Sequence, residues 1–275
     1  MTRTASSFSG VGGTNIAYDV YEPEGDPKGL ILVAHGLGEH RGRYHHVADK
    51  LVGLGLRVAV PDHRGHGESG GPRADTRNVD EFTADLESLR KLTLVEGKPT
   101  YLLGHSMGGL IALDYALDHQ ADLKVLILSG ALVLPGEDQP PWLVAIAKVL
   151  GKVVPTLGTL ALDPKSVSRD PKVVEAYEND PLNYHGKIKA GTGAALLNRL
   201  QTFPGRLPSL TLPLLVMHGE KDTLTNPEGS RLVDKLAGSS DKTLTIYPGL
   251  FHEIFNEPEQ DQVLTDMATW LEKHL

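Results

Sequence analysis

Residues 104–108 read Gly-His-Ser-Met-Gly, and this stretch decides the fold that we expect. An apolar run at residues 101–103 precedes it, and a helix-like apolar run at residues 110–116 follows it. This order of strand, turn and helix is what a nucleophile elbow requires. The turn is so tight that residues two positions from the serine can hardly carry a Cβ, a demand that Gly104 and Gly108 meet. Since the chain has 30 glycines, an ordinary glycine-rich turn is the alternative.

A serine hydroxyl becomes a nucleophile only beside a base, and the base needs a group that orients it. Behind an elbow of this kind the partners follow in the order acid, then histidine, each after a strand. A strand-like run at residues 214–217 is followed by Asp222, and another at residues 243–247 is followed by His252. We therefore predict a catalytic triad of Ser106, Asp222 and His252. The alternatives are that Asp222 caps a turn or helix and that His252 is a surface histidine.

The charge that develops during attack by a serine needs N–H donors to hold it. The amide of Met107 is one expected donor, because it follows the nucleophile. The second should come from residues 35–40, His-Gly-Leu-Gly-Glu-His, which follow a strand-like run at residues 30–34. The glycines on either side of Leu37 let the backbone turn so that its N–H faces the substrate. A plain glycine turn is again the alternative.

Strand-like and helix-like runs alternate along the chain, which predicts an α/β fold with a mostly parallel, doubly wound sheet. The expected helices lie around residues 44–54 and 79–95, and the expected strands at 7–11, 15–21, 30–34, 57–60, 101–103, 124–128, 214–217 and 243–247.

The alternation of strand-like and helix-like runs is interrupted between Ser129 and Leu212, where no clear strand pattern is present. Interruptions of that length inside a compact domain are usually functional. We predict a core of residues 1–130 and 211–275, with a helical cap, or lid, of residues 131–210 inserted over the strand ends, where ligands bind in open α/β sheets.

Within the predicted cap, residues 142–154 form the most apolar stretch of the chain. It is shorter than the roughly 20 residues that a membrane span needs, and two lysines interrupt it. Such a helix could lay its apolar face on a lipid surface, or the same face could pack within the cap. Both interpretations stay open.

Composition narrows the possible functions. A formal charge of -8 argues against a nucleic-acid partner, because the chain has no basic stripe. With no cysteine there is neither a disulfide framework nor thiol chemistry. Residues 1–7 contain no apolar core, so we expect no secretory signal and a cytoplasmic address, with peripheral membrane contact through the cap as a further expectation. His45 and His46 lack other ligands at metal-binding spacing, so no metal is predicted.

Three motifs together resemble those of the monoacylglycerol lipase family of the α/β-hydrolases. The motifs are residues 35–40 with Arg43 and Tyr44, the Asp-His-Arg-Gly-His-Gly-Glu-Ser of residues 62–69, and residues 104–109. The resemblance implies a bacterial member of that family. It also implies the α/β-hydrolase fold and a serine hydrolase that releases glycerol and a fatty acid from monoacylglycerols through an acyl-enzyme, without a cofactor or metal. Mammalian members carry thiols near the site, which this chain lacks.

Glu39, Arg43 and His105 are the expected substrate-binding residues. The polar residues that follow the glycines of the oxyanion loop could bind the two free hydroxyls of a monoacylglycerol, directly or through water; they are Glu39, His40, Arg43 and Tyr44. Arg43 could instead pair with Glu39 and merely hold the loop. A carboxylesterase or lysophospholipase on the same scaffold is the alternative enzyme. A ligand receptor with a hydrolase fold is the non-enzymatic alternative, and the triad counts against it.

Overall fold

In this computed structural model, which describes residues 1–134 and 149–275, eight strands form one sheet in the order β1-β2-β4-β3-β5-β6-β7-β8. Their bounds are β1 Thr2–Ser9, β2 Asn15–Glu22, β3 Leu30–Ala34, β4 Arg57–Pro61, β5 Thr100–His105, β6 Val125–Ser129, β7 Leu214–Gly219 and β8 Lys242–Tyr247. β2 pairs antiparallel with both β1 and β4, and all other neighbours pair in parallel. The predicted mostly parallel sheet is confirmed.

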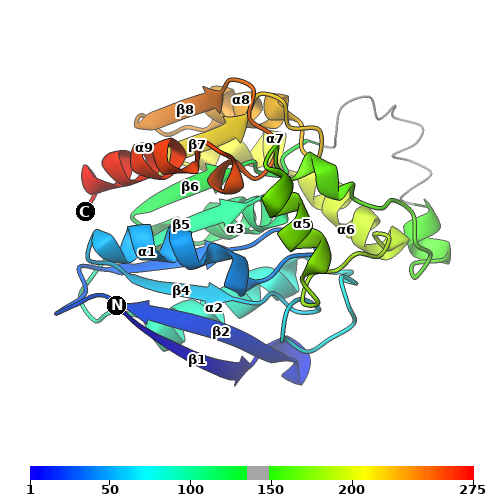
Figure 1. Ribbon diagram of the computed structural model, residues 1–275, viewed down its shortest axis with the longest axis horizontal. Coiled ribbons are helices and arrows are strands. Elements are labelled where there is room, and N and C mark those ends of the chain that lie inside the picture. Colours follow the sequence, from blue (N-terminus) through cyan, green and yellow to red (C-terminus); the bar gives the residue numbers. More distant parts are fainter. Residues whose placement is uncertain (135–148) are drawn as a thin grey trace.

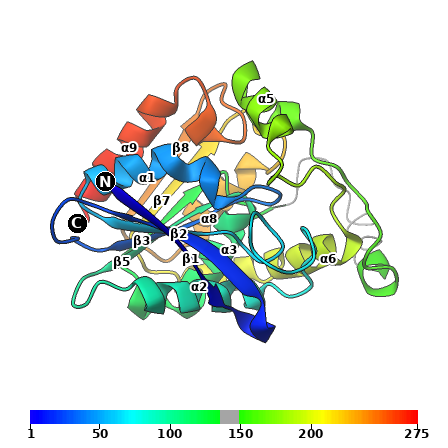
Figure 2. The same ribbon diagram turned by 60° about the horizontal axis from the view of Figure 1, so that its bottom comes forward.

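Helices cover both faces of the sheet (Figures 1 and 2). One face carries α1 (His45–Gly53) and α9 (Gln260–Glu272); the other carries α2 (Asp80–Thr93), α3 (Met107–Asp118) and α8 (Pro227–Leu236). All five residues of β3 and all five of β6 are buried, because helices cover both faces of these strands and neither face is exposed to solvent. Successive residues alternate between the two layers: Leu102 packs with α2 and α3, whereas Leu103 packs with α1 and α9.

The order of the central strands fixes where a ligand can bind. From β3 the chain moves outward to β4, and it then returns to β5 on the other side of β3. The loops that leave β3 and β5 therefore diverge at their carboxyl ends and open a crevice between them, which is the usual ligand site of such sheets. These loops contain Leu37 and Ser106.

The described residues between β6 and β7 lie over the carboxyl ends of the strands (Figure 1). Its described residues form α5 (Pro171–Asn179), α6 (Ala190–Leu200), α7 (Phe203–Arg206), a helical stretch at 149–153 and one isolated bridge between Gly158 and Lys189. Leu196 and Leu200 of α6 join the same apolar cluster as α2 and α3. Of the helix predicted at 142–154, residues 142–148 lie outside the described residues.

Short 3₁₀ helices complete the structure of the described residues, at Val11–Gly13, Arg41–Tyr44, Gln120–Asp122, Pro164–Ser166, Leu207–Ser209 and Ile254–Asn256. Three elements differ from the sequence-based expectation. β1 spans Thr2–Ser9, whereas a strand was expected at 7–11, because most of this edge strand is exposed and gives no apolar signal. Neither α8 nor α9 was predicted, although the buried Val263, Met267, Trp270 and Leu271 of α9 follow the helical period.

The close packing of α3 on β3 yields a stability prediction. A Cβ on Gly108 would lie 2.1 Å from the Ala34 carbonyl oxygen and 2.5 Å from that of His35. Because backbone atoms cannot move aside as a side chain can, we expect Gly108→Ala to lower the free energy of unfolding by about 1–3 kcal/mol or more in urea titrations. Gly53→Ala is the control: Gly53 lies in α1 with no atom within 4 Å of the added Cβ, so its stability should stay level or rise. Equal losses in both variants would contradict this account.

Candidate active site

Ser106 occupies the turn between β5 and α3 in a strained backbone conformation. Its φ is 55° and its ψ is -121°, in the left-handed half of conformational space that side-chain-bearing residues rarely adopt. A Cβ on Gly104 would lie 2.3 Å from the Gly108 carbonyl oxygen, so the turn has no room for side chains at these positions. The tight turn predicted from the sequence is present, and it lifts Ser106 above the strand ends.

Ser106, His252 and Asp222 form one chain of hydrogen bonds. The Oγ of Ser106 lies 2.9 Å from Nε2 of His252, and Nδ1 of His252 lies 2.6 Å from Oδ2 of Asp222. Because a carboxylate only accepts hydrogen bonds, Nδ1 carries the imidazole proton and Nε2 accepts from the serine hydroxyl. Asp222 follows β7 and His252 follows β8, as predicted. Three loops at the carboxyl ends of three strands thus bring the predicted residues together.

Burial and charge set the protonation states of this chain. Burial alone would raise the pKa of Asp222, but its partners His252 and His218 outweigh burial and hold that pKa well below the usual range. Burial alone would lower the pKa of His252, but the Asp222 carboxylate outweighs burial and raises it above 6.5. Asp222 is therefore a carboxylate at neutral pH, and His252 is a strengthened base.

The alternative that Asp222 caps a helix does not hold. The cap of α8 is Asn226, whose side chain accepts a hydrogen bond from the Glu228 amide at 2.9 Å. Oδ1 of Asp222 instead accepts from the Leu224 amide at 2.8 Å and from the Thr225 amide at 3.0 Å, so Asp222 does cap the turn that follows it, while its Oδ2 faces His252.

Three polar residues beside this chain were not assigned from the sequence. Nε2 of His218 lies 3.0 Å from Oδ2 of Asp222, and the Thr225 hydroxyl lies 2.8 Å from the same oxygen. Glu253 adjoins His252 and lines the cavity described below. The spacing of four residues between His218 and Asp222 was visible in the sequence, but it became informative only once β7 was seen to end at Gly219.

The two predicted oxyanion donors flank Ser106. Met107 is the first residue of α3, so its N–H has no partner within the helix. The N–H of Leu37 donates to no backbone acceptor in the described part of the chain. Gly38 has a φ of +81°, which turns this loop sharply, and a Cβ on Gly36 would lie 3.1 Å from Cβ of Ser106. The loop after β3 therefore passes directly beside the serine.

Glu39 and Arg43 are joined in a buried ion-pair network. Oε1 of Glu39 accepts from the Gly36 amide at 2.5 Å and from the Tyr44 hydroxyl at 2.7 Å, and Oε2 accepts from Arg43 at 2.8 Å. Arg43 also donates to both oxygens of Glu253, at 2.6 and 2.7 Å. The pairing of Arg43 with Glu39, which the sequence left open, is thus present. Glu39 and Glu253 line the cavity, whereas Arg43 does not.

His105 is buried beside the predicted base. Its ring centroid lies 4.8 Å from that of His252, and its Nδ1 lies 3.2 Å from the Ser129 hydroxyl. Burial, aided by His252, lowers the pKa of His105 to about 4, so this imidazole is neutral at neutral pH. It lines the cavity as an uncharged polar group.

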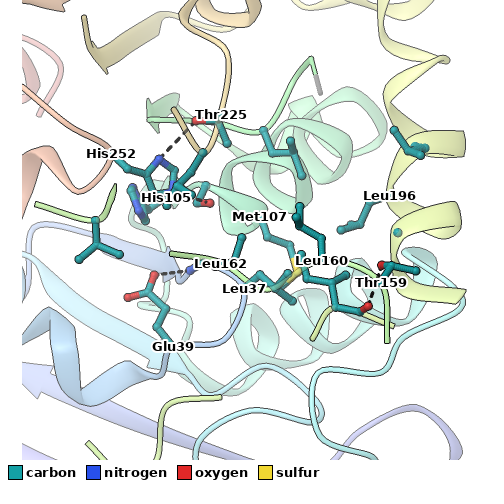
Figure 3. A pocket seen from close by; sticks show the side chains of 18 of the residues that line it. Leu37, Glu39, His105, Met107, Thr159, Leu160, Leu162, Leu196, Thr225 and His252 are labelled. Atoms are coloured by element: carbon teal, nitrogen blue, oxygen red, sulfur yellow. Dashed lines mark hydrogen bonds between the residues drawn. The ribbon is translucent and has the colours of Figure 1, made fainter. Parts of the chain in front are cut away.

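A cavity of about 460 Å³ opens at Ser106, within the size range of sites for small ligands. Figure 3 shows Glu39, His105 and His252 at one end of it and Thr159, Leu160 and Leu196 at the other. The hydrophobic lining consists mainly of Leu37, Met107, Leu132, Leu150, Leu160, Leu162, Leu196, Leu197 and Leu200. The cavity therefore has a polar end near His252 and a long apolar end beneath the inserted segment.

The remaining histidines named in the sequence analysis are used in ordinary contacts. Nδ1 of His45 lies 2.5 Å from the Tyr21 hydroxyl, and Nε2 of His46 lies 2.9 Å from the Phe255 carbonyl oxygen. Within residues 1–134 and 149–275, no three His, Asp or Glu side chains gather as a metal ion would require. In those same ranges, none of the helices has both the length and the apolar character to cross a bilayer.

Known proteins resemble this chain over its whole length. Residues 25–259 match the family model described as serine aminopeptidase, S33. The chain is 47% identical over 276 residues to a monoacylglycerol lipase of Mycolicibacterium smegmatis, covering 100% of this chain and 99% of that protein. It is 38% identical over 258 residues to the monoglyceride lipase of Homo sapiens, covering 91% of this chain and 84% of that protein.

A solved structure agrees. The crystal structure of the Paleococcus ferrophilus monoacylglycerol lipase superposes with a TM-score of 0.84 at 31% identity and covers 100% of both chains. The fold, the motifs and these matches lead to one assignment: the chain belongs to the family described as serine aminopeptidase, S33, and within the α/β-hydrolase superfamily it belongs with the monoacylglycerol lipases.

Proposed function

We propose that this chain is a serine hydrolase that cleaves monoacylglycerols to glycerol and a free fatty acid. The observation that carries the proposal is the hydrogen-bonded chain of Ser106, His252 and Asp222, which opens into a cavity with one polar and one apolar end. A monoacylglycerol has the same division, with a glycerol headgroup on one side of the ester and a single acyl chain on the other. The names of the relatives support the same substrate class.

The mechanism follows from the positions of the groups. Oγ of Ser106 attacks the ester carbonyl carbon while Nε2 of His252 takes its proton, and Asp222 orients and stabilises the imidazolium. The amides of Leu37 and Met107 hold the oxyanion of the tetrahedral intermediate. The intermediate collapses when His252 returns the proton to the glycerol oxygen, which leaves an acyl group on Ser106. Water, deprotonated by His252, then releases the fatty acid.

We assign the glycerol headgroup to the end of the cavity that carries Glu39, His105 and Glu253. Arg43 acts through the two carboxylates, because its guanidinium faces them rather than the cavity. It is therefore a positioning residue in this proposal. The acyl chain occupies the leucine-lined end, where apolar surface is removed from water.

We further propose that residues 131–210 form the cap and that the cap meets lipid. Five of the nine exposed large apolar side chains of the described residues lie there: Val149 is 59% exposed, Val153 72% and Leu160 54%, and Val154 and Leu157 are the other two. Leu160 also lines the cavity, so this surface adjoins the entrance. Apolar patches of this kind suit transient contact with a membrane or lipid aggregate. The cytoplasmic address stays a prediction from the N-terminal sequence.

Substrate profiling tests the assignment. The purified protein is offered mono-, di- and triacylglycerols, a lysophospholipid and a short nitrophenyl ester, and kcat/KM is compared. We expect the monoacylglycerol to be preferred, since a triacylglycerol has no free hydroxyl for the polar end and two extra chains to place. Preference for the short ester or the lysophospholipid would support the alternative enzymes. Ligand binding without turnover of any ester would support the receptor interpretation.

Replacement of triad residues gives a direct prediction. Ser106→Ala removes the attacking oxygen, and Asp222→Asn favours the wrong tautomer of His252, so each should lower turnover by roughly 10⁴-fold or more. Both variants should stay folded, and Ser106→Ala should change the free energy of unfolding by less than about 1 kcal/mol because its side chain packs little. Near-normal hydrolysis by either folded variant would remove that residue from the mechanism.

The pH dependence follows from the raised pKa of His252. Only the neutral imidazole can accept the serine proton, so kcat/KM should fall as the pH drops through the His252 pKa, which lies above the ordinary value of 6.5. Glu253 and Asp222 do not titrate there, because Arg43 helps to hold the pKa of Glu253 at about 2 against burial, and His252 and His218 hold the pKa of Asp222 well below its usual range. A profile of kcat/KM against pH, measured with a soluble ester, gives the midpoint of this fall, which is the acid limb of the profile. A midpoint clearly below pH 6.5 would contradict the assignment.

If the cap contacts lipid, a charge in its apolar surface should slow hydrolysis of an aggregated substrate but not of a soluble one. Val153→Glu places a charge on the most exposed apolar side chain of the patch, so hydrolysis of an aggregated long-chain monoacylglycerol should fall several-fold. A short soluble ester should be hydrolysed as before. Leu92→Glu, at a residue of α2 that is 58% exposed, is the matched control and should leave both rates unchanged. Equal losses of Val153→Glu on both substrates would mean that the patch is structural.

A further inference from the structure

A second buried histidine binds the carboxylate of the proposed triad. His218 lies near the end of β7, four residues before Asp222, and it is fully buried. Its Nε2 lies 3.0 Å from Oδ2 of Asp222. The same oxygen accepts Nδ1 of His252 at 2.6 Å, so two imidazoles share one carboxylate oxygen.

The partners of His218 fix which of its nitrogens carries a proton. Nε2 of His218 also lies 3.3 Å from the Thr225 hydroxyl. Because the low pKa of Asp222 makes it a carboxylate, which only accepts, the 3.0 Å contact with Oδ2 is favourable when Nε2 of His218 carries a proton. Nδ1 of His218 lies 2.6 Å from the hydroxyl of Ser230, a fully buried residue of α8. In the neutral imidazole, Nδ1 therefore accepts the Ser230 proton. Ser230 thus holds His218 in the tautomer that donates to Asp222.

His218 differs from the other donors to Asp222 in where it is anchored. The amides of Leu224 and Thr225 belong to the loop that contains Asp222 itself, so they move with it. His218 belongs to β7, which pairs with β6 on one side and β8 on the other. Its contact therefore ties the loop of Asp222 to the sheet and, through Ser230, to α8.

We infer that His218 is a positioning residue for the hydrolysis proposed above. It holds the Asp222 carboxylate against the sheet, and its N–H stabilises the negative charge of that carboxylate. The inference rests on the proposed function. Two consequences follow. Loss of the donor should let the Asp222 carboxylate shift out of hydrogen-bond alignment with His252, which should lower kcat more than it changes KM. Loss of the donor should also make the carboxylate more basic, which raises the pKa of His252 and moves the acid limb of the pH profile upward.

Two amide substitutions separate these effects from simple loss of packing. His218→Gln can place an N–H near the position of Nε2, within reach of Asp222, whereas His218→Asn reaches only as far as the position of Nδ1 and can keep the contact with Ser230. We expect His218→Asn to lower kcat for a soluble ester by about 10–100-fold, with KM little changed and the acid limb at higher pH. His218→Gln should remain within a few-fold of the wild type, with its acid limb in place.

Val233→Ala is the control for lost stability, since Val233 is buried in α8 without a polar contact to the site. It should lower Tm and leave the acid limb unmoved. Equal kcat and equal acid limbs for the Asn and Gln variants would overturn the inference, as would wild-type behaviour of His218→Asn. If the wild type hydrolyses no ester, the proposed function itself has failed, which is a separate result.

Nitrogen-15 NMR of histidine-labelled wild-type protein tests the same inference without any substitution at residue 218. The His218 resonances should report a proton on Nε2. A neutral His218 with its proton on Nδ1 would place a lone pair against Asp222, and this result would overturn the inference even if the Asn variant did not fold.

Discussion

The close approach of the backbones at Gly104 and Gly108, where β5 turns into α3 beside the end of β3, is the constraint on which the rest of the structure depends. Gly108 lets α3 approach the carbonyl groups of Ala34 and His35, and Gly104 lets the chain turn back on itself. This turn holds Ser106 at a strained φ of 55°. It also places the Ser106 hydroxyl between the loop after β3 and the loop after β8, where a substrate carbonyl could meet both a base and the expected amide donors.

Buried charges then hold these loops in place. Arg43 joins Glu39, from the loop after β3, to Glu253, which adjoins His252 in the loop after β8. Breaking such a buried network leaves uncompensated charges, so its members stabilise one another's positions more than they add net stability. The Asp222 cluster does the same on the other side of His252. The imidazole is thereby fixed between two networks whose polar atoms are largely satisfied within the protein.

Much of the fold could be predicted because the central strands are buried on both faces and read as apolar runs. β3 was predicted at its observed bounds, and the elbow was recognisable because Gly104 and Gly108 answer a steric demand that only glycine meets. Only the last residues of β1 were predicted, as part of a strand at 7–11, since an exposed edge strand pairs through its backbone and needs no apolar pattern. The direction of Arg43 also could not be read from sequence, because Glu253 is 210 residues away. His218 was missed for a related reason: its role depends on where β7 ends.

Labelling with a fluorophosphonate tests the central claim most directly, namely that Ser106 is the nucleophile activated by His252. The reagent forms a bond between phosphorus and the attacking oxygen, with loss of fluoride. Peptide mass spectrometry of the wild-type protein should find one adduct, on the peptide that contains Ser106, and full labelling should abolish ester hydrolysis. An adduct on a different residue, or unimpaired hydrolysis by protein fully labelled at Ser106, would contradict the account.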